Sequence, residues 1–141
     1  MSDTHQATAT TRHLPFDVRQ TAILIGVGIV LWFVAAVLLR VLGPMGIYEG
    51  SGRIALYTLI IPGTVPFVPL VRRLAGIGRD QIALGVSIAM MDAMFCDGIA
   101  LAWFPELYGS SAEHTAGAGA AILWGAAVAI GLGVLFNRSE A

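Results

Sequence analysis

Hydrophobic residues fall into four long runs along this chain, separated by short polar segments rich in glycine, proline and charged residues. The runs cover about residues 21–42, 53–71, 82–104 and 116–136. As helices rising about 1.5 Å per residue, they are long enough for the roughly 30 Å hydrocarbon core of a bilayer. They lack the strict alternation of half-buried strands. We therefore expect an all-α integral membrane protein, a bundle of four transmembrane helices.

Polar segments precede the first run and follow the last one. Residues 1–20 are rich in threonine and lack the apolar core and cleavage site of a secretory signal. We expect them to form a disordered cytoplasmic tail, with Asp17 capping the first helix, and residues 137–141 to form a second cytoplasmic tail. His5 and His13 have no cysteine or carboxylate cluster beside them, so no metal site is expected there.

Composition supports a membrane environment. Hydrophobic residues make up 57% of the 141 residues and charged residues 12%, which is too little charge to cover a soluble domain of this size. All eight basic residues are arginine and the net charge is −1, so a basic surface for nucleic acid is not expected. The single cysteine, Cys96, lies within an apolar run and gives no disulfide framework.

The distribution of arginine predicts the orientation in the membrane. Placing both termini in the cytoplasm puts six arginines on that side and two on the other: Arg12, Arg19, Arg72, Arg73, Arg79 and Arg138 against Arg40 and Arg53. Tyr48, Tyr57, Trp103 and Tyr108 then lie toward the outer interface, which aromatic residues favour. We expect a multi-pass protein of the cell inner membrane with both termini cytoplasmic. Beyond the lipid bilayer, another membrane protein or a second copy of the chain are the partners this arrangement allows.

The second run contains a break in its helix. Pro62, Gly63, Pro66 and Pro69 cannot lie in an undisturbed helix, because each proline lacks an amide donor and clashes with the preceding turn. Thr64 lies inside the break, near mid-membrane, where hydroxyl groups can satisfy freed carbonyls. Two interpretations remain open: a packing kink, which is favoured, and a broken-helix binding site.

Small residues recur at every fourth position of the last run. They are Gly117, Ala121, Gly125, Ala129 and Gly133. This stripe lets another helix approach closely, so it predicts a helix-packing face. A seam within the chain is favoured over one with another subunit, because a four-span bundle needs at least one such close contact.

Two carboxylates, Asp92 and Asp97, lie inside the third run. An ionised carboxylate at that depth costs several kcal/mol unless it is paired, hydrated or protonated. Five residues on a helix correspond to a rotation of about 140°, so the two acids do not share a face. Asp97 lies at a level that Arg40 and Arg53 can reach, which predicts a structural ion pair.

Asp92 has no basic residue at its own depth, and Gly85, Ala89 and Cys96 leave space around it. Two interpretations carry equal weight. The acid is either a site for a proton or cation beside the broken second helix, or a protonated group that hydrogen-bonds two helices together.

No catalytic group of residues is evident. All three histidines lie outside the apolar runs, so haem ligation inside the bundle is not expected. Neither a phosphate-binding loop nor a nucleophile elbow is present, and no nucleophile has a base in reach. We therefore expect neither enzyme activity nor a metal or cofactor.

A resemblance to a known family covers roughly Gly52 to Gly109. It rests on two segments on either side of the proline-rich run, GSGRIALY and AMMDAMFCDGIALAWFPELYG. Their order resembles a family of small bacterial four-span integral membrane proteins classed as a domain of unknown function. That family has an aspartate after a small-Met pair and a Phe-Pro at the outer end of the third span, matched here by Met91, Asp92, Phe104 and Pro105. The resemblance implies the four-span fold and lends weight to Asp92, without implying a substrate.

These observations predict a non-catalytic accessory or scaffold subunit of a membrane assembly. Four spans enclose little space, and transporters this small normally work as oligomers, which favours that role. The alternative is a small proton- or cation-coupled transporter-like protein that uses Asp92 beside the broken second helix.

Overall fold

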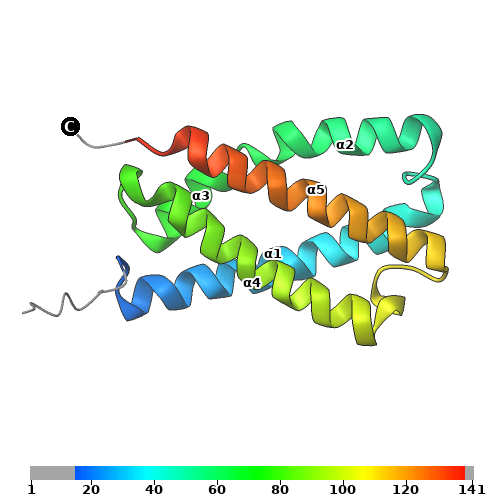
Figure 1. Cartoon of the computed structure of the whole chain (residues 1–141), viewed down its shortest axis with the longest axis horizontal. Coiled ribbons are helices and arrows are strands. Elements are labelled where there is room, and N and C mark those ends of the chain that lie inside the picture. The colour runs from blue at the N-terminus through cyan, green and yellow to red at the C-terminus, as the bar shows by residue number, and fades with distance from the viewer. Residues whose placement is uncertain (1–14, 139–141) are drawn as a thin grey trace, which may run out of the picture.

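The computed structural model describes residues 15–138, and all the regular structure in that range is helical. Five α-helices follow one another: α1 (Val18–Leu42), α2 (Gly50–Thr64), α3 (Phe67–Ala75), α4 (Ile82–Trp103) and α5 (Ala112–Phe136). Short 3₁₀ helices, η1 (Gly43–Met45), η2 (Arg79–Gln81) and η3 (Pro105–Leu107), lie in the connections. Four segments of this described chain are long and apolar enough to cross a membrane, with α2 and α3 forming one of them. The predicted all-α four-helix transmembrane bundle is therefore confirmed (Figure 1).

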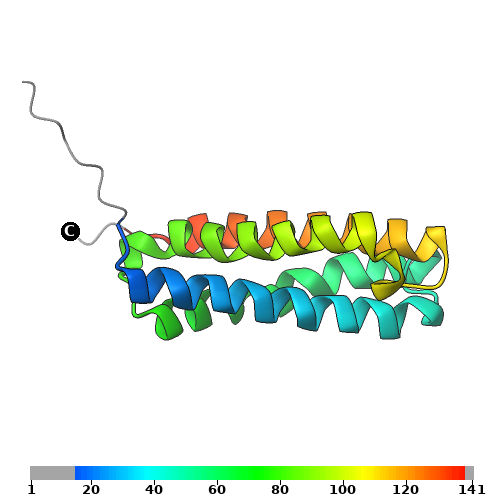
Figure 2. The same ribbon diagram turned by 90° about the horizontal axis from the view of Figure 1, so that it is seen from below.

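The helices run side by side, and both ends of the described chain lie at the same end of the bundle (Figures 1 and 2). Helix α4 is central, since it packs against α1, α3 and α5. Helix α2 packs mainly along α5 and makes at most marginal contact with α1. The bundle is therefore closed on three sides and loosely packed on the side between α1 and α2.

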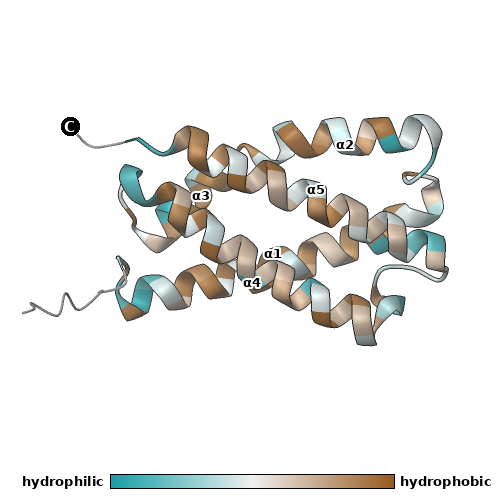
Figure 3. Ribbon diagram, viewed as in Figure 1, coloured by the Kyte–Doolittle hydropathy of each residue, from teal (hydrophilic) through white to brown (hydrophobic). Residues whose placement is uncertain are grey.

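Hydrophilic residues gather toward the two ends of the bundle, and hydrophobic residues cover most of the length between them (Figure 3). Many large apolar side chains on the outside are exposed, among them Val30, Phe33, Phe95 and Leu135. Such a surface suits a hydrocarbon environment, where exposing apolar groups has no cost.

Helix α1 begins at Val18, three residues before the predicted start at residue 21, because Asp17 forms a capping box with Gln20. The Asp17 carboxylate accepts a hydrogen bond from the Gln20 amide at 2.6 Å, and the Gln20 side chain accepts one from the Asp17 amide at 3.1 Å. Phe16, expected in the tail, is buried against the core. Residues 1–14 of that predicted tail, with His5, His13 and Arg12, lie outside the described residues, as do residues 139–141.

Helix α5 also begins earlier than predicted, at Ala112 instead of residue 116. The Ser111 hydroxyl caps it by accepting a hydrogen bond from the His114 amide at 3.1 Å. Polar residues of the first turn can therefore belong to the helix while lying outside the hydrocarbon core.

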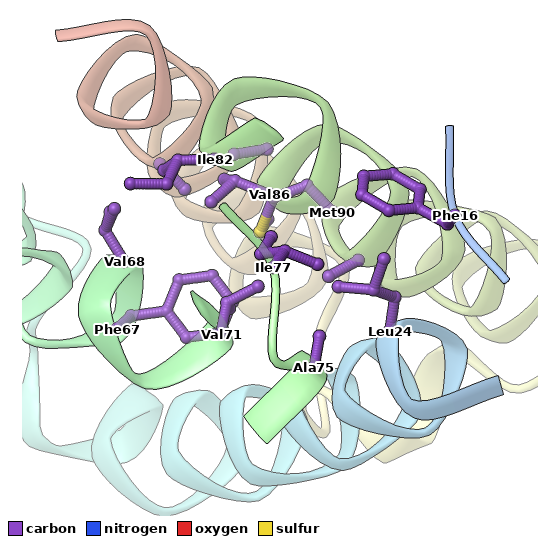
Figure 4. Close-up of a cluster of buried hydrophobic side chains, with 13 residues drawn as sticks. Phe16, Leu24, Phe67, Val68, Val71, Ala75, Ile77, Ile82, Val86 and Met90 are labelled. Atoms are coloured by element: carbon purple, nitrogen blue, oxygen red, sulfur yellow. The ribbon is translucent and has the colours of Figure 1, made fainter. Parts of the chain in front are cut away.

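The core near the chain ends is built around α3. Its buried residues, Phe67, Val68, Val71 and Ala75, recur at the spacing of one helical face. Figure 4 shows Phe67 and Val71 gathered around Ile77 with Leu24 of α1 and with Val86 and Met90 of α4. A second cluster at the opposite end contains Ala36, Leu39, Tyr48, Ala100, Tyr108, Ala118 and Ala121.

The end of the described chain is joined to the start of α4. The Asn137 side chain accepts a hydrogen bond from the Ala83 amide at 3.1 Å, and the Arg138 amide donates one to the Arg79 carbonyl at 3.1 Å. Asn137 therefore satisfies one of the amides that a helix leaves free in its first turn.

The small-residue stripe of α5 packs within the chain. A Cβ added at Gly133 lies 3.1 Å from Val86 of α4, and one added at Gly117 lies 2.5 Å from the ring of Tyr48. Between them along the stripe lie Ala121, Gly125 and Ala129, of which the two alanines are buried. Within the described residues, the stripe therefore packs against other segments of its own chain.

The second span bends at Val65 and Pro66, between α2 and α3. Pro62 lies inside α2, and the Thr64 hydroxyl donates a hydrogen bond to the Ile60 carbonyl at 2.6 Å. The two halves differ in packing, because α3 has a buried face whereas α2 has no fully buried residue. The predicted break thus separates a well-packed half-span from a loosely packed one.

Candidate functional site

A cavity of about 370 Å³ lies inside the bundle, walled by α1, α2, α4 and α5 together with Phe67 at the start of α3. Its lining is apolar apart from Trp32, Thr64 and Asp97. Val34 and Leu38 of α1 line it and are about half exposed, at 49% and 52%. Because α1 and α2 are hardly in contact, the cavity opens between them toward the membrane.

Asp97 is the acidic side chain in the wall of this cavity, and only 5% of its surface is exposed. Its Oδ1 accepts a hydrogen bond from the hydroxyl of Tyr108. The Tyr108 oxygen in turn accepts one from Nε1 of Trp32 at 3.0 Å. A chain of hydrogen bonds thus joins α1 to α4 through a residue of the connection that follows α4.

Tyr108 is fully buried although it belongs to the loop between α4 and α5. Burial, and next the hydrogen bond to Asp97, raise the pKa of the Tyr108 hydroxyl above its usual value. The phenol therefore keeps its proton and serves as a donor to the carboxyl group.

Neither Arg40 nor Arg53 forms the ion pair predicted with Asp97 among the described residues. Nη1 of Arg40 donates a hydrogen bond to the Glu106 carbonyl, and Nε of Arg53 donates one to the Tyr48 carbonyl at 2.8 Å. Both arginines lie toward the ends of their helices, where long cationic side chains reach out to the interface instead of into the bundle. The partner of Asp97 is the neutral phenol of Tyr108.

Asp92 lies at the crossing of α4 with α1, and it is not among the residues that line the cavity. A Cβ added at Gly28 of α1 lies 3.0 Å from Oδ2 of Asp92 and 2.5 Å from the Ala89 carbonyl. That Oδ2 is buried and has no hydrogen-bond partner in the described part of the chain. The expected position beside the broken second helix is thus corrected: since Asp97 faces the cavity, the rotation between the two acids turns Asp92 toward α1.

The structure therefore brings together two of the three polar residues predicted for one site, Asp97 and Thr64, and places Asp92 elsewhere. Sequence reasoning missed Trp32 and Tyr108. The signal for Tyr108 was weak, since an aromatic residue shortly after a transmembrane span is normally an interface residue.

A second cavity, of about 500 Å³, lies at the end of the bundle away from the chain ends, between the first turns of α2 and α5. Its polar lining residues are Tyr48, Glu49, Arg53, Tyr57, Glu113 and His114. No group of three His, Cys, Asp or Glu within residues 15–138 has the arrangement of a metal site. The hydroxyl of Tyr48 donates a hydrogen bond to the Leu39 carbonyl at 3.0 Å, and burial raises the pKa of this hydroxyl.

No protein-family model matches this chain, and neither a curated protein nor a solved structure matches it. The resemblance to an uncharacterised four-span family stays a prediction.

Proposed function

We propose that this protein is a non-catalytic membrane protein that binds a bilayer-soluble ligand in the cavity between α1, α2, α4 and α5, with Asp97 as its polar anchor. One observation carries the proposal: the carboxyl group of Asp97, a residue that is 5% exposed, stands in the wall of a cavity whose lining is apolar apart from Trp32 and Thr64. Apolar cavities of this size with a few convergent polar groups are typical of ligand sites.

The loose side of the bundle supports entry of such a ligand from the membrane. The two walls that flank the opening, α1 and α2, are hardly in contact, and α2 contributes no fully buried residue. The bend at Val65 and Pro66 separates α2 from the well-packed α3, which is the kind of position where a hinge between two half-spans lies.

Filling the cavity tests the proposal. Gly125 lines it, and the nearest atom to an added Cβ is Ile60 Cγ2 at 3.8 Å, so Gly125→Leu occupies ligand space without a clash at Cβ. We expect this variant to bind ω-bromodecanol at least about tenfold more weakly, a loss of about 1.4 kcal/mol. Quenching of Trp32 by the bromine, in a background of Trp103→Phe and Trp124→Phe in nanodiscs, measures the saturable binding.

Gly131→Leu is the matched control for this experiment. Gly131 lies on the same helix, has no atom within 4 Å of an added Cβ, and is not part of the cavity lining. Its variant is expected to bind the alcohol like the parent protein. Equal binding by both variants, or quenching that never saturates, would contradict a site in the cavity.

An accessory-subunit role is a second candidate, and the packing of α2 favours it. Ile54 and Leu59 of α2 are 71% and 67% exposed, and no residue of this helix is fully buried. A helix of a partner protein would cover this surface. A photoreactive amino acid at position 59 is expected to cross-link to a membrane protein if this role applies, whereas cross-links to lipid alone would count against it.

We also propose that the protein resides in a bacterial inner membrane with both termini in the cytoplasm. The bundle end that holds both ends of the described chain carries five of its seven arginines, Arg19, Arg72, Arg73, Arg79 and Arg138. Arg40 and Arg53 lie toward the other end. Five arginines against two fits the preference of arginine for the cytoplasmic side.

A reporter fused after Ala141 tests this orientation. We expect a green fluorescent protein fusion to fluoresce and an alkaline phosphatase fusion at the same position to be inactive, because the first reporter folds in the cytoplasm and the second in the periplasm. The reverse pattern would overturn the proposed orientation.

A further inference from the structure

We infer that the ligand of this cavity is an amphiphilic organic cation of the alkylammonium class, and that Asp97 binds it in exchange for a proton. The inference rests on the proposed cavity function and adds the charge of the ligand and the chemistry of its binding.

The side chains that surround Asp97 supply no positive charge. On α4 its ionisable neighbours are Cys96 and, five residues away, Asp92, neither of which supplies positive charge. The loop contributes the phenol of Tyr108, and α1 contributes the neutral indole of Trp32. The lining residues from α2, α3 and α5 include no ionisable side chain.

No cation in the cavity lining therefore compensates the carboxylate. The guanidinium of Arg40 is occupied by the Glu106 carbonyl, and that of Arg53 by the Tyr48 carbonyl. Tyr108 supplies one hydrogen bond to Asp97 but no positive charge. Since an ionised carboxylate without a cationic partner is costly in an apolar cavity, Asp97 holds its proton while the cavity is empty. A ligand that brings its own positive charge removes that cost.

Binding exchanges the proton of Asp97 for an alkylammonium ion. An alkylammonium ion enters with its charge, the O–H bond of the Asp97 carboxyl group breaks, and the proton passes to water. An N–H···O hydrogen bond then joins the ammonium group to the carboxylate as an ion pair. One positive charge enters and one leaves, so the net charge of the cavity is unchanged.

Two neighbours suit the ion pair. Tyr108 occupies Oδ1 of Asp97, which leaves Oδ2 for the ammonium group and makes Tyr108 a positioning residue. Trp32 lines the cavity, and an indole ring attracts a cation placed over its face. Apolar lining residues such as Leu31, Ile60 and Ile122 accommodate the alkyl chain.

A pair of probes with the same alkyl chain separates the two proposals. ω-Bromodecanol is neutral and reports the cavity alone, whereas ω-bromodecylammonium also reports the charge. Binding of each to the full chain in nanodiscs is followed by quenching of Trp32, and proton release by a pH indicator in weakly buffered solution. We expect the ammonium probe to bind and to release about one proton per bound molecule, and the alcohol to bind without release.

The pH dependence has a definite sign. Because binding releases a proton, the apparent affinity for the ammonium probe is expected to rise about tenfold per pH unit while the empty site holds its proton. The affinity levels off once the empty site is ionised. The affinity for the alcohol does not rise with pH. These measurements use the background with Trp32 as the single tryptophan and need no substitution at Asp97, so they test the inference even if substitutions at Asp97 fail to fold.

Asp97→Asn is expected to abolish proton release and to weaken binding of the ammonium probe at least about tenfold, while binding of the alcohol persists. Asp92→Asn is the matched control, since it removes a carboxyl group from the same helix outside the cavity lining, and it is expected to leave all readouts unchanged. Binding of both probes without proton release overturns the exchange and leaves the cavity function standing. Binding of neither probe overturns both proposals, and proton release that follows Asp92 overturns the assignment to Asp97.

Discussion

Tyr108→Phe is expected to lower the free energy of unfolding by about 2–4 kcal/mol, because it removes one hydroxyl that serves two partially or fully buried groups. Oδ1 of Asp97 loses its donor, and Nε1 of Trp32 loses its acceptor at 3.0 Å. The ring itself is retained, so packing in the fully buried position of Tyr108 stays nearly the same. Reversible unfolding in mixed micelles of increasing denaturing detergent measures the difference.

Tyr57→Phe is the control for this experiment. Tyr57 stacks on Trp124 with ring centroids 5.6 Å apart, and no hydrogen bond of its hydroxyl is found among the described residues. The same loss of one oxygen is expected there to change the stability by less than about 0.5 kcal/mol. Equal stability of the two variants would show that the chain from Trp32 to Asp97 contributes nothing.

Gly28→Ala is expected to lower the free energy of unfolding by about 1–3 kcal/mol, because one added methyl group overpacks the crossing of α1 and α4. The new Cβ lies 2.5 Å from the Ala89 carbonyl oxygen, which belongs to the backbone and cannot rotate away. The helices must therefore separate, which also loosens the packing of Asp92. Unfolding in mixed micelles, and the temperature at which the protein aggregates in mild detergent, report the loss.

Gly26→Ala is the control that separates the steric clash at Gly28 from the change in helix propensity. Gly26 lies two residues earlier on α1 and has no atom within 4 Å of an added Cβ. Alanine favours the helix over glycine at both positions, so the difference between the variants measures the contact with α4. A Gly28→Ala protein as stable as Gly26→Ala would contradict the close approach of the two helices.

Hydropathy predicted the fold because a bilayer leaves few alternatives. Backbone groups in hydrocarbon must bond within their own segment, so each long apolar run becomes a helix. Helix ends were predicted less well, since α1 and α5 continue into polar residues that lie outside the apolar runs. The capping side chains of Asp17 and Ser111 mark those ends, and only the first of them was identified from the sequence.

The candidate site was predicted only in part, for a geometric reason. The sequence gives the angle between Asp92 and Asp97 around their helix, but not the rotation of that helix relative to its neighbours. That rotation depends on contacts such as the one at Gly28, which decide that Asp97 and not Asp92 faces the cavity. The prediction for Arg40 and Arg53 used the length of their side chains, which sets only the largest distance at which they can contact Asp97. Both guanidinium groups instead donate hydrogen bonds to backbone carbonyls near the helix ends.

The cap that Asn137 provides for the start of α4 has a consequence for biosynthesis. Its side chain bonds to the amide of Ala83, which leaves the ribosome 54 residues earlier. When α4 enters the membrane, that amide has no protein partner until α5 has crossed back and delivered Asn137 to the same side. The fourth span therefore completes the third one, and a nascent chain halted before Asn137 is expected to expose an unfinished helix end to the machinery that removes incomplete membrane proteins.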